Sequence, residues 1–129
     1  MKESNFQFNK PILKSIEYRI CDEFNQEQEV TLHRHLCQNV IRIEGKNEAI
    51  VELIIEIGCD EKSINAPFCL KMTIGAGFRW NEELEEFKIE KLLSINAPSL
   101  LLSYARPIIA NITSNSIVEY DIPFINFVE

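Results

Sequence analysis

The sequence lacks the features of several large protein classes. No apolar run approaches the roughly 20 residues that a membrane-spanning helix needs, and Met1–Asn5 does not begin an apolar signal peptide. Basic residues are few, with 13 Lys and Arg against 20 Asp and Glu and a net charge of −7. A field of that sign repels phosphate backbones and anionic headgroups. We therefore expect a cytoplasmic protein that neither inserts into membranes nor binds nucleic acid.

Glycine is also scarce, and no two cysteines are close in the sequence. The four glycines and five prolines mark turns, and no repeat or linker divides the 129 residues, so we expect a single domain over residues 1–129. In a reducing cytosol, widely spaced cysteines usually act as small apolar core residues. Their spacing, without a Cys-x-x-Cys pair, gives little support to a redox or zinc site. The cysteines are Cys21, Cys37, Cys59 and Cys69.

Alternating apolar residues predict a four-stranded antiparallel sheet in the first two thirds of the chain. The expected strands cover Ile12–Phe24, Thr31–Glu44, Val51–Ile57 and Phe68–Trp80. Period-two alternation of this kind indicates strands with one buried face. Because the expected connections are short, successive strands should pair as a meander.

After the fourth strand, the apolar period changes to that of a helix. Asn81 is a favourable N-cap with acidic residues in the turn that follows it, and it predicts the start of a first helix. A second helix is expected from Pro98 to about Asn115, with a kink or local break at Pro107. Strands followed by helices predict an α+β fold, with two C-terminal helices packed on the sheet.

Two sets of side chains could carry chemistry, and a structural role is favoured for both. His33, His35 and Cys37 would share one strand face, but they would span ~13 Å, too far for one metal ion with bonds near ~2 Å. Carboxylates of the first helix could form an acid–base pair, although at helical spacing beside lysines they more often form a solvated face. These are Glu82, Glu83, Glu85, Glu86 and Glu90. We expect no enzyme and no metal or other cofactor.

Arg106 lies beside Tyr104 on a largely apolar predicted helix. An isolated guanidinium is costly to bury without a partner. We therefore expect Arg106 to be structural, either in a salt bridge or as a clamp on a backbone carbonyl at the sheet edge.

The C-terminal quarter of the chain, from Asn96 to Phe127, has the most order-specific pattern. It reads Asn-Ala-Pro, then Ser-Leu-Leu-Leu-Ser-Tyr-Ala-Arg, and later the extended Ile-Pro-Phe-Ile-Asn-Phe of Ile122–Phe127. This order resembles the end of the SecB-like family, the protein-export chaperone SecB and its relatives. The resemblance implies a SecB-like fold whose helix packs between the dimers of a tetramer, and apolar grooves that hold non-native polypeptides.

The resemblance also implies a chaperone that binds unfolded or extended polypeptides. We expect polypeptide contacts at the aromatic residues near the two ends of the chain, Phe6, Phe8, Phe124 and Phe127. The second helix is apolar on more sides than one sheet can cover, so we expect a homo-oligomer with a two-fold contact. Its expected interface residues are Leu100, Leu101, Tyr104 and Ile108.

Departures from the family pattern leave two functions open. A translocation ATPase is a partner that the family implies, but the sequence stops at Glu129, before the family's final helix and the acidic tail that contacts that ATPase. The first function is a holdase that binds many non-native chains, for protein export or for another role. The second is a dedicated interaction module on the same fold, which binds one folded partner or one peptide such as an antitoxin segment.

Overall fold

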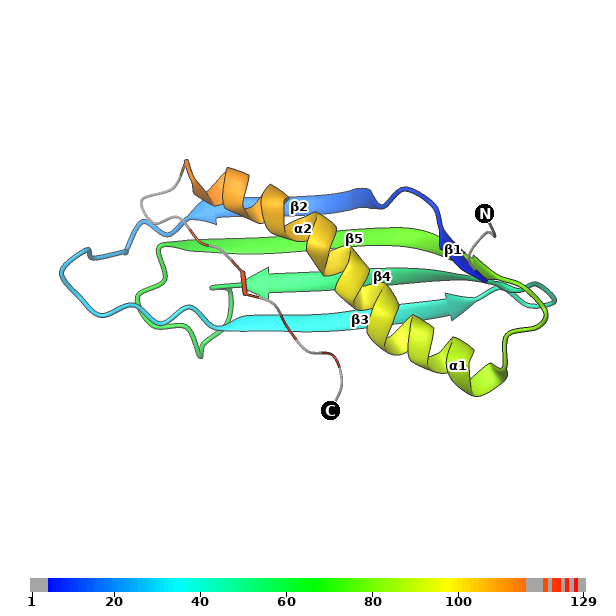
Figure 1. The fold of residues 1–129 in the computed structure, drawn as a ribbon. Coiled ribbons are helices and arrows are strands. Elements are labelled where there is room, and N and C mark those ends of the chain that lie inside the picture. Colours follow the sequence, from blue (N-terminus) through cyan, green and yellow to red (C-terminus); the bar gives the residue numbers. More distant parts are fainter. Residues whose placement is uncertain (1–4, 116–119, 121, 124, 126, 128–129) are drawn as a thin grey trace.

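The centre of the protein is one antiparallel sheet, seen in a computed structural model that describes residues 5–115, 120, 122, 123, 125 and 127 (Figure 1). The sheet order is β1-β5-β4-β3, and β2 pairs with β5 on the same edge as β1. The strands are β1 (Phe6–Phe8), β2 (Ile12–Ile20), β3 (Arg34–Arg42), β4 (Glu48–Ile57) and β5 (Phe68–Trp80).

The expected four-stranded meander is wrong in two respects. The long β2 pairs with β5 and not with β3. The connection from β2 to β3, residues 21–33, therefore crosses the end of the sheet (Figure 1). Within it, Thr31 makes only an isolated bridge to Ile64, and β3 begins at Arg34. The short β1 is a fifth strand, separated from β2 near Pro11, a residue that has no N–H for a ladder.

The two central strands show why the alternation was clear in sequence. In β4 and β5, Leu53 lies opposite Ile74, and both side chains are buried on one face of the sheet. On the other face, Glu56 lies opposite Lys71. The sheet therefore has one core face and one open face, as expected for an antiparallel sheet.

One continuous helical stretch covers the core face and crosses the strands diagonally (Figure 1). It consists of α1 (Glu86–Lys91), a π-helical segment (Leu92–Asn96) and α2 (Ala97–Thr113), so the two expected helices are joined. The first begins later than expected, because the side-chain oxygen of Asn81 accepts the backbone N–H of Glu83 in a preceding turn. No helix in the described part of the chain is long and apolar enough to cross a membrane.

Helix α2 continues through Pro107, where a kink or break was expected. Proline removes one N–H, which leaves the carbonyl of the residue four positions earlier, Ser103, without its usual donor. Both residues lie on the exposed side of the helix, where water can satisfy that carbonyl. The position of Pro107 on this side explains why the helix tolerates it.

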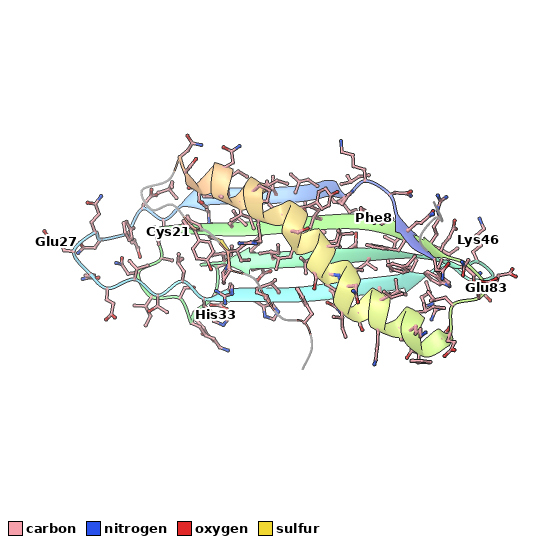
Figure 2. All side chains as sticks on the ribbon, in the orientation of Figure 1. Phe8, Cys21, Glu27, His33, Lys46 and Glu83 are labelled. Carbon is pink, nitrogen blue, oxygen red and sulfur yellow. A yellow bond between two sulfur atoms is a disulfide. The ribbon has the colours of Figure 1, made fainter. Side chains whose placement is uncertain are left out.

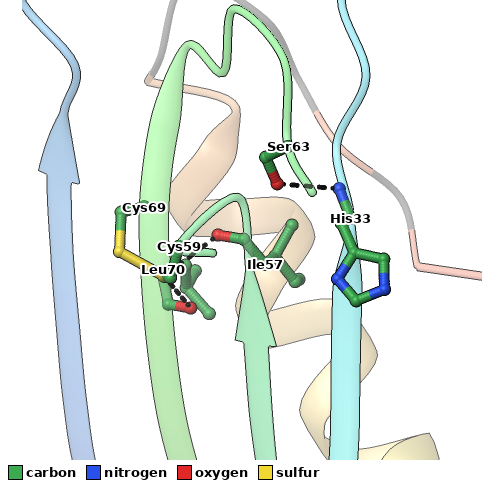
Figure 3. The surroundings of a disulfide bond; sticks show 6 residues. All are labelled: His33, Ile57, Cys59, Ser63, Cys69 and Leu70. Atoms are coloured by element: carbon green, nitrogen blue, oxygen red, sulfur yellow. Dashed lines mark hydrogen bonds between the residues drawn. A yellow bond between two sulfur atoms is a disulfide. The ribbon is translucent and has the colours of Figure 1, made fainter. Parts of the chain in front are cut away.

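A disulfide joins Cys59 and Cys69 at the mouth of the β4–β5 connection (Figure 3). The last residue of β4 pairs with Leu70, and Gly58 then turns the chain with a φ of 73°, so that the two cysteine Cα atoms lie 4.8 Å apart. A Cβ at Gly58 would collide with the Phe68 carbonyl, so this approach requires glycine. The expectation that the cysteines are only core residues is therefore wrong for this pair.

Candidate polypeptide-binding and oligomer surfaces

Helix α2 divides the core face of the sheet into two sides (Figure 1). One side, towards β1 and β2, carries the β2-side surface, defined as Phe8, Leu13, Ile16, Leu100, Tyr104 and Ile108. The other side, towards β3 and the C-terminal residues, carries the tail-side surface, defined as Leu32, Leu36, Tyr120, Ile125 and Phe127. Each surface combines apolar side chains from a strand edge with apolar side chains from the C-terminal part of the chain.

The β2-side surface is open. Leu13 and Ile16 point to the core face, yet each is 38% exposed because α2 does not reach across them. From the helix, Leu100, Tyr104 and Ile108 recur every four residues and so share one flank. Tyr104 is 43% exposed. Large apolar side chains gathered on a surface indicate an interaction site.

The outer edge of β2 adds to this surface. β2 pairs with β5, and no other strand among the described residues pairs with it. Its outer N–H and C=O groups are therefore a template for another strand. The sequence analysis recognised the alternation here but not the interface, because alternation does not distinguish an edge strand from a central one.

The β1 strand brings two of the predicted polypeptide contacts to the β2 side. The Phe6 ring stacks on Phe78 and Trp80, with centroid distances of 5.5 and 6.3 Å, so Phe6 forms part of the wall of the core. Phe8 lies 6.1 Å from Phe78 and remains 43% exposed (Figure 2). Of the two, Phe8 is the more accessible to a partner.

On the tail side, polar contacts fix the described C-terminal residues. Tyr120 donates its backbone N–H to the Thr113 hydroxyl (3.0 Å), and its own hydroxyl accepts from Arg34 (3.3 Å). Arg106 Nε donates to the carbonyl of Ile122 (2.9 Å), and Ile122 is only 1% exposed. The expected role of Arg106 as a carbonyl clamp is confirmed, although the carbonyl belongs to the C-terminal segment rather than to the sheet edge.

The four predicted polypeptide contacts do not gather at one place. Phe127 is half-buried against the core on the tail side, whereas Phe6 and Phe8 lie beyond α2 on the β2 side. Phe124 lies outside the described residues. The structure therefore separates the two ends of the chain that the sequence analysis combined into one groove.

The four predicted interface residues also differ in accessibility. Leu101 is completely buried against the sheet, so it belongs to the core of the chain and cannot reach a second copy. Leu100 and Ile108 are half-buried, and Tyr104 is exposed. These three remain candidates for an interface.

The carboxylates of the first helix include one with a clear structural partner. Glu86 forms an ion pair with Arg42 of β3, and the Arg42 guanidinium lies 5.2 Å above the Trp80 ring. The hydrogen bond from Arg42 lowers the pKa of the Glu86 carboxyl, and the same bond raises the pKa of Arg42. The pair attaches α1 to the edge of the sheet.

The three residues considered as metal ligands do not share one strand. His33 precedes β3, and its Nδ1 pairs with Asp60 of the β4–β5 connection. His35 lies opposite Glu56 on the open face, and Cys37 is exposed two residues further along. Within the described residues, no group of three or more His, Cys, Asp or Glu side chains could hold a metal ion.

Neither a protein-family model nor a curated protein matches this sequence. Among solved structures, the Mycobacterium tuberculosis SecB-like chaperone Rv1957, in complex with a ChAD peptide from the HigA1 antitoxin, matches with a TM-score of 0.77. The identity is 12%, over 95% of this chain and 91% of that chain. A protein of unknown function from Streptococcus agalactiae matches with a TM-score of 0.42 and 11% identity, over 91% of this chain and 97% of that one.

At such low identity, structural likeness establishes the fold and leaves the activity to be argued from the surfaces themselves. The match to the chaperone covers 95% of this chain, nearly its whole length. This chain therefore has the SecB-like fold, an α+β arrangement of an antiparallel sheet covered by a C-terminal helix.

Proposed function

We propose that this protein is a homo-oligomeric chaperone that binds extended or non-native polypeptides, rather than an enzyme. The observation that carries the proposal is the pair of apolar surfaces on either side of α2, each next to a strand whose outer edge pairs with no other strand among the described residues. Apolar pockets beside a free strand edge can accept an extended chain. The antitoxin peptide in the complex of the similar SecB-like chaperone supports polypeptide as the ligand class.

We assign the β2-side surface to a second copy of the chain. A two-fold axis through Tyr18 would extend the sheet by antiparallel pairing of β2 with its copy, and would place Glu17 opposite Arg19 of the other copy. The same register places Ile16 opposite Ile20 on the core face. An axis one residue earlier would place Glu17 opposite itself, which like-charge repulsion disfavours.

We assign the tail-side surface to the polypeptide. Its residues are half-buried and apolar, and they include aromatic rings from the C-terminal segment. Because these side chains are already held against the core, a bound chain can pack on them with little further ordering. The Tyr120 ring already packs 6.3 Å from Phe68, edge to face. Because this surface is small, we expect modest affinity for short peptides, on the order of micromolar.

The second candidate function is a dedicated peptide-binding module. The observation in its favour is that the similar chaperone was solved with one defined antitoxin peptide. A module of this kind would bind one sequence tightly and ignore unrelated unfolded chains. Handover of clients to a translocation ATPase is not part of either proposal.

Titration with permanently unfolded proteins tests the proposal and separates the two candidates. Several unrelated unfolded chains should form complexes, and the protein should reduce the aggregation of a heat-denatured client. Apolar binding should survive a rise from 0.1 to 1 M salt, whereas charge-driven binding should fade as screening increases. Failure to bind any of the unfolded chains would overturn the holdase, and tight binding of one peptide alone would establish the module.

A further inference from the structure

We propose that Cys21, Cys59 and Cys69 form a thiol–disulfide exchange site at the end of the sheet, where the 21–33 connection leaves β2. The Cys59–Cys69 disulfide is one state of this site, and a Cys21–Cys69 disulfide is the other. The inference does not rest on the proposed binding function, because its evidence is the strand register around Cys21 and the Cys59–Cys69 disulfide, and its test reads disulfide connectivity.

The strand register places Cys21 beside the disulfide. Arg19 lies directly opposite Cys69, and the backbone N–H of Cys21 donates to the Pro67 carbonyl (3.0 Å), so the β2–β5 ladder continues past the end of β2. Residues two apart in a strand point to the same face, and Cys21 therefore lies on the face that carries Cys69. The two cysteines are diagonal neighbours in adjacent strands.

The approach that the exchange requires is small. Diagonal neighbours in an antiparallel pair have Cα atoms ~7–8 Å apart. A disulfide needs a Cα separation of about 4.4–6.8 Å. A shift of about 1–2 Å therefore brings Cys21 into range, and Cys21 lies where the chain leaves the ladder.

The exchange is balanced without any added oxidant. The Cys21 thiolate attacks Sγ of Cys69, the Cys21–Cys69 bond forms as the Cys59–Cys69 bond breaks, and Cys59 leaves as a thiolate that takes a proton from water. One thiol and one disulfide are present before and after the step. Cys21 is half-buried and lines a cavity of about 340 Å³, so a small thiol or disulfide can also reach it.

Two backbone carbonyls near Cys59 could accept a hydrogen bond from its thiol when the disulfide is open. Its Sγ lies 3.3 Å from the carbonyl of Leu70 and 3.4 Å from that of Ile57 (Figure 3). Once Cys59 is released and protonated, its S–H can donate to either carbonyl, so the reduced residue gains a partner where it already lies. The fold can therefore hold both states without loss of its last β4–β5 pairs.

The two states would hold the 21–33 connection differently. At present the β4–β5 connection, closed by the disulfide, anchors it through Asn65, whose amide donates to the carbonyls of Asn25 (2.7 Å) and Gln28 (3.3 Å). The Ser63 hydroxyl also accepts the backbone N–H of His33 (3.0 Å). In the exchanged state, Cys21 would tie the connection directly to β5, while the β4–β5 connection would lose its covalent closure.

Trypsin makes the test direct, because it places each cysteine on a separate peptide. The peptides are Ile20–Arg34, His35–Arg42, Asn47–Lys62 and Ser63–Lys71. The full-length Cys59→Ser protein is equilibrated with reduced and oxidised glutathione at pH 8, blocked with N-ethylmaleimide, digested and examined by mass spectrometry. We expect Ile20–Arg34 to be joined to Ser63–Lys71. A Cys37→Ser control should keep Asn47–Lys62 joined to Ser63–Lys71, as in the wild type.

Free or separately glutathionylated Cys21 and Cys69 in the Cys59→Ser protein, with normal circular dichroism, would overturn the proposal. If the Cys59→Ser protein does not fold, the exchange is tested in the wild type. Held at pH 8 without glutathione, it should develop the Ile20–Arg34/Ser63–Lys71 pair, and the Cys21→Ser protein should not. Absence of that pair from the folded wild type would contradict the exchange.

Discussion

The side chains at the two edges of the sheet, β3 and β2, make different kinds of contact. On the β3 edge, the side chains hold other parts of the chain: Arg42 pairs with Glu86, Gln38 donates to the Ser94 carbonyl (3.0 Å), and Arg34 donates to Tyr120. On the β2 edge, the core-face side chains of Leu13, Ile16 and Ile20 remain exposed. The polar side chains of the β3 edge already have partners within the chain, whereas the exposed apolar side chains of the β2 edge are typical of an interface with another molecule.

The largest effect is expected at Ile16, in the middle of the edge strand β2. Ile16→Asp places a charge in the proposed two-fold contact, and each buried isoleucine contributes about 1.5–3 kcal/mol. Because symmetry applies the change twice, we expect dimer affinity to fall by a factor on the order of 10³ or more. Light scattering should show the 15.0 kDa monomer.

Ile41→Asp is the matched control for this change. Ile41 is exposed on β3, but on the open face of the sheet, away from the proposed contact. It should leave the oligomer intact. A wild-type protein that scatters as a monomer at all concentrations would remove the basis of the comparison.

On the tail side, Arg106→Ala should loosen the C-terminal segment. The change leaves the buried carbonyl of Ile122 without its donor, which costs about 1–3 kcal/mol. We expect urea unfolding at a correspondingly lower midpoint, with no change in oligomer mass. Arg79→Ala, which removes a donor to Gln7 at an exposed site, should have a smaller effect. Normal stability with lost polypeptide binding would make Arg106 a contact residue instead.

An exchange of charge between Glu17 and Arg19 tests the proposed register of β2 with its copy. Arg19→Glu would place Glu17 of one copy opposite a new carboxylate of the other, at two related positions. We expect dimer affinity to fall roughly tenfold, which corresponds to about 1.4 kcal/mol. The double variant Glu17→Arg/Arg19→Glu should recover it. Equal loss in single and double variants would argue for a different register.

The smallest expected effect is the pH dependence of the Arg42–Glu86 pair. Arg42 lowers the pKa of the Glu86 carboxyl in the folded state, so the pair stabilises the protein above the unfolded pKa of glutamate. This contribution is lost as the pH falls through the folded pKa of Glu86. The melting temperature of Glu86→Gln should be slightly below that of the wild type at pH 7, and the difference should close in acid. A constant difference across the titration would contradict the pair.

Local patterns in the sequence predicted the elements better than their pairing. The alternation of Leu53 and its neighbours identified β4, and the helical spacing after Pro98 identified α2, because these signals depend on neighbouring residues. The pairing of β2 with β5 depends on which distant strand covers the edge, and no local period encodes that choice. The connection after Ile20 was therefore interpreted as a turn within a meander, although it crosses the end of the sheet.

The candidate surfaces were predictable only in part. Tyr104 was identified from its place on an overly apolar helix, and Arg106 from the cost of burying its charge. The separation of Phe8 from Phe127 could not be found in this way, because it depends on the diagonal path of α2 across the sheet. The disulfide was equally hidden, since Cys59 and Cys69 meet only because the turn at Gly58 brings them together.

The pairing of β2 with β5 has a consequence for the order of assembly. Ile20 pairs with Phe68 and Phe6 pairs with Trp80, so these strands pair with residues far along the chain. The strands β4 and β5, by contrast, are joined by a ten-residue connection. Contacts between residues far apart in sequence form slowly because a long loop must close first. The β3–β4 and β4–β5 hairpins, with connections of five and ten residues, should therefore form before β2 docks. During synthesis, a protein proposed to hold non-native chains itself presents an unpaired, apolar strand until its fifth strand has emerged.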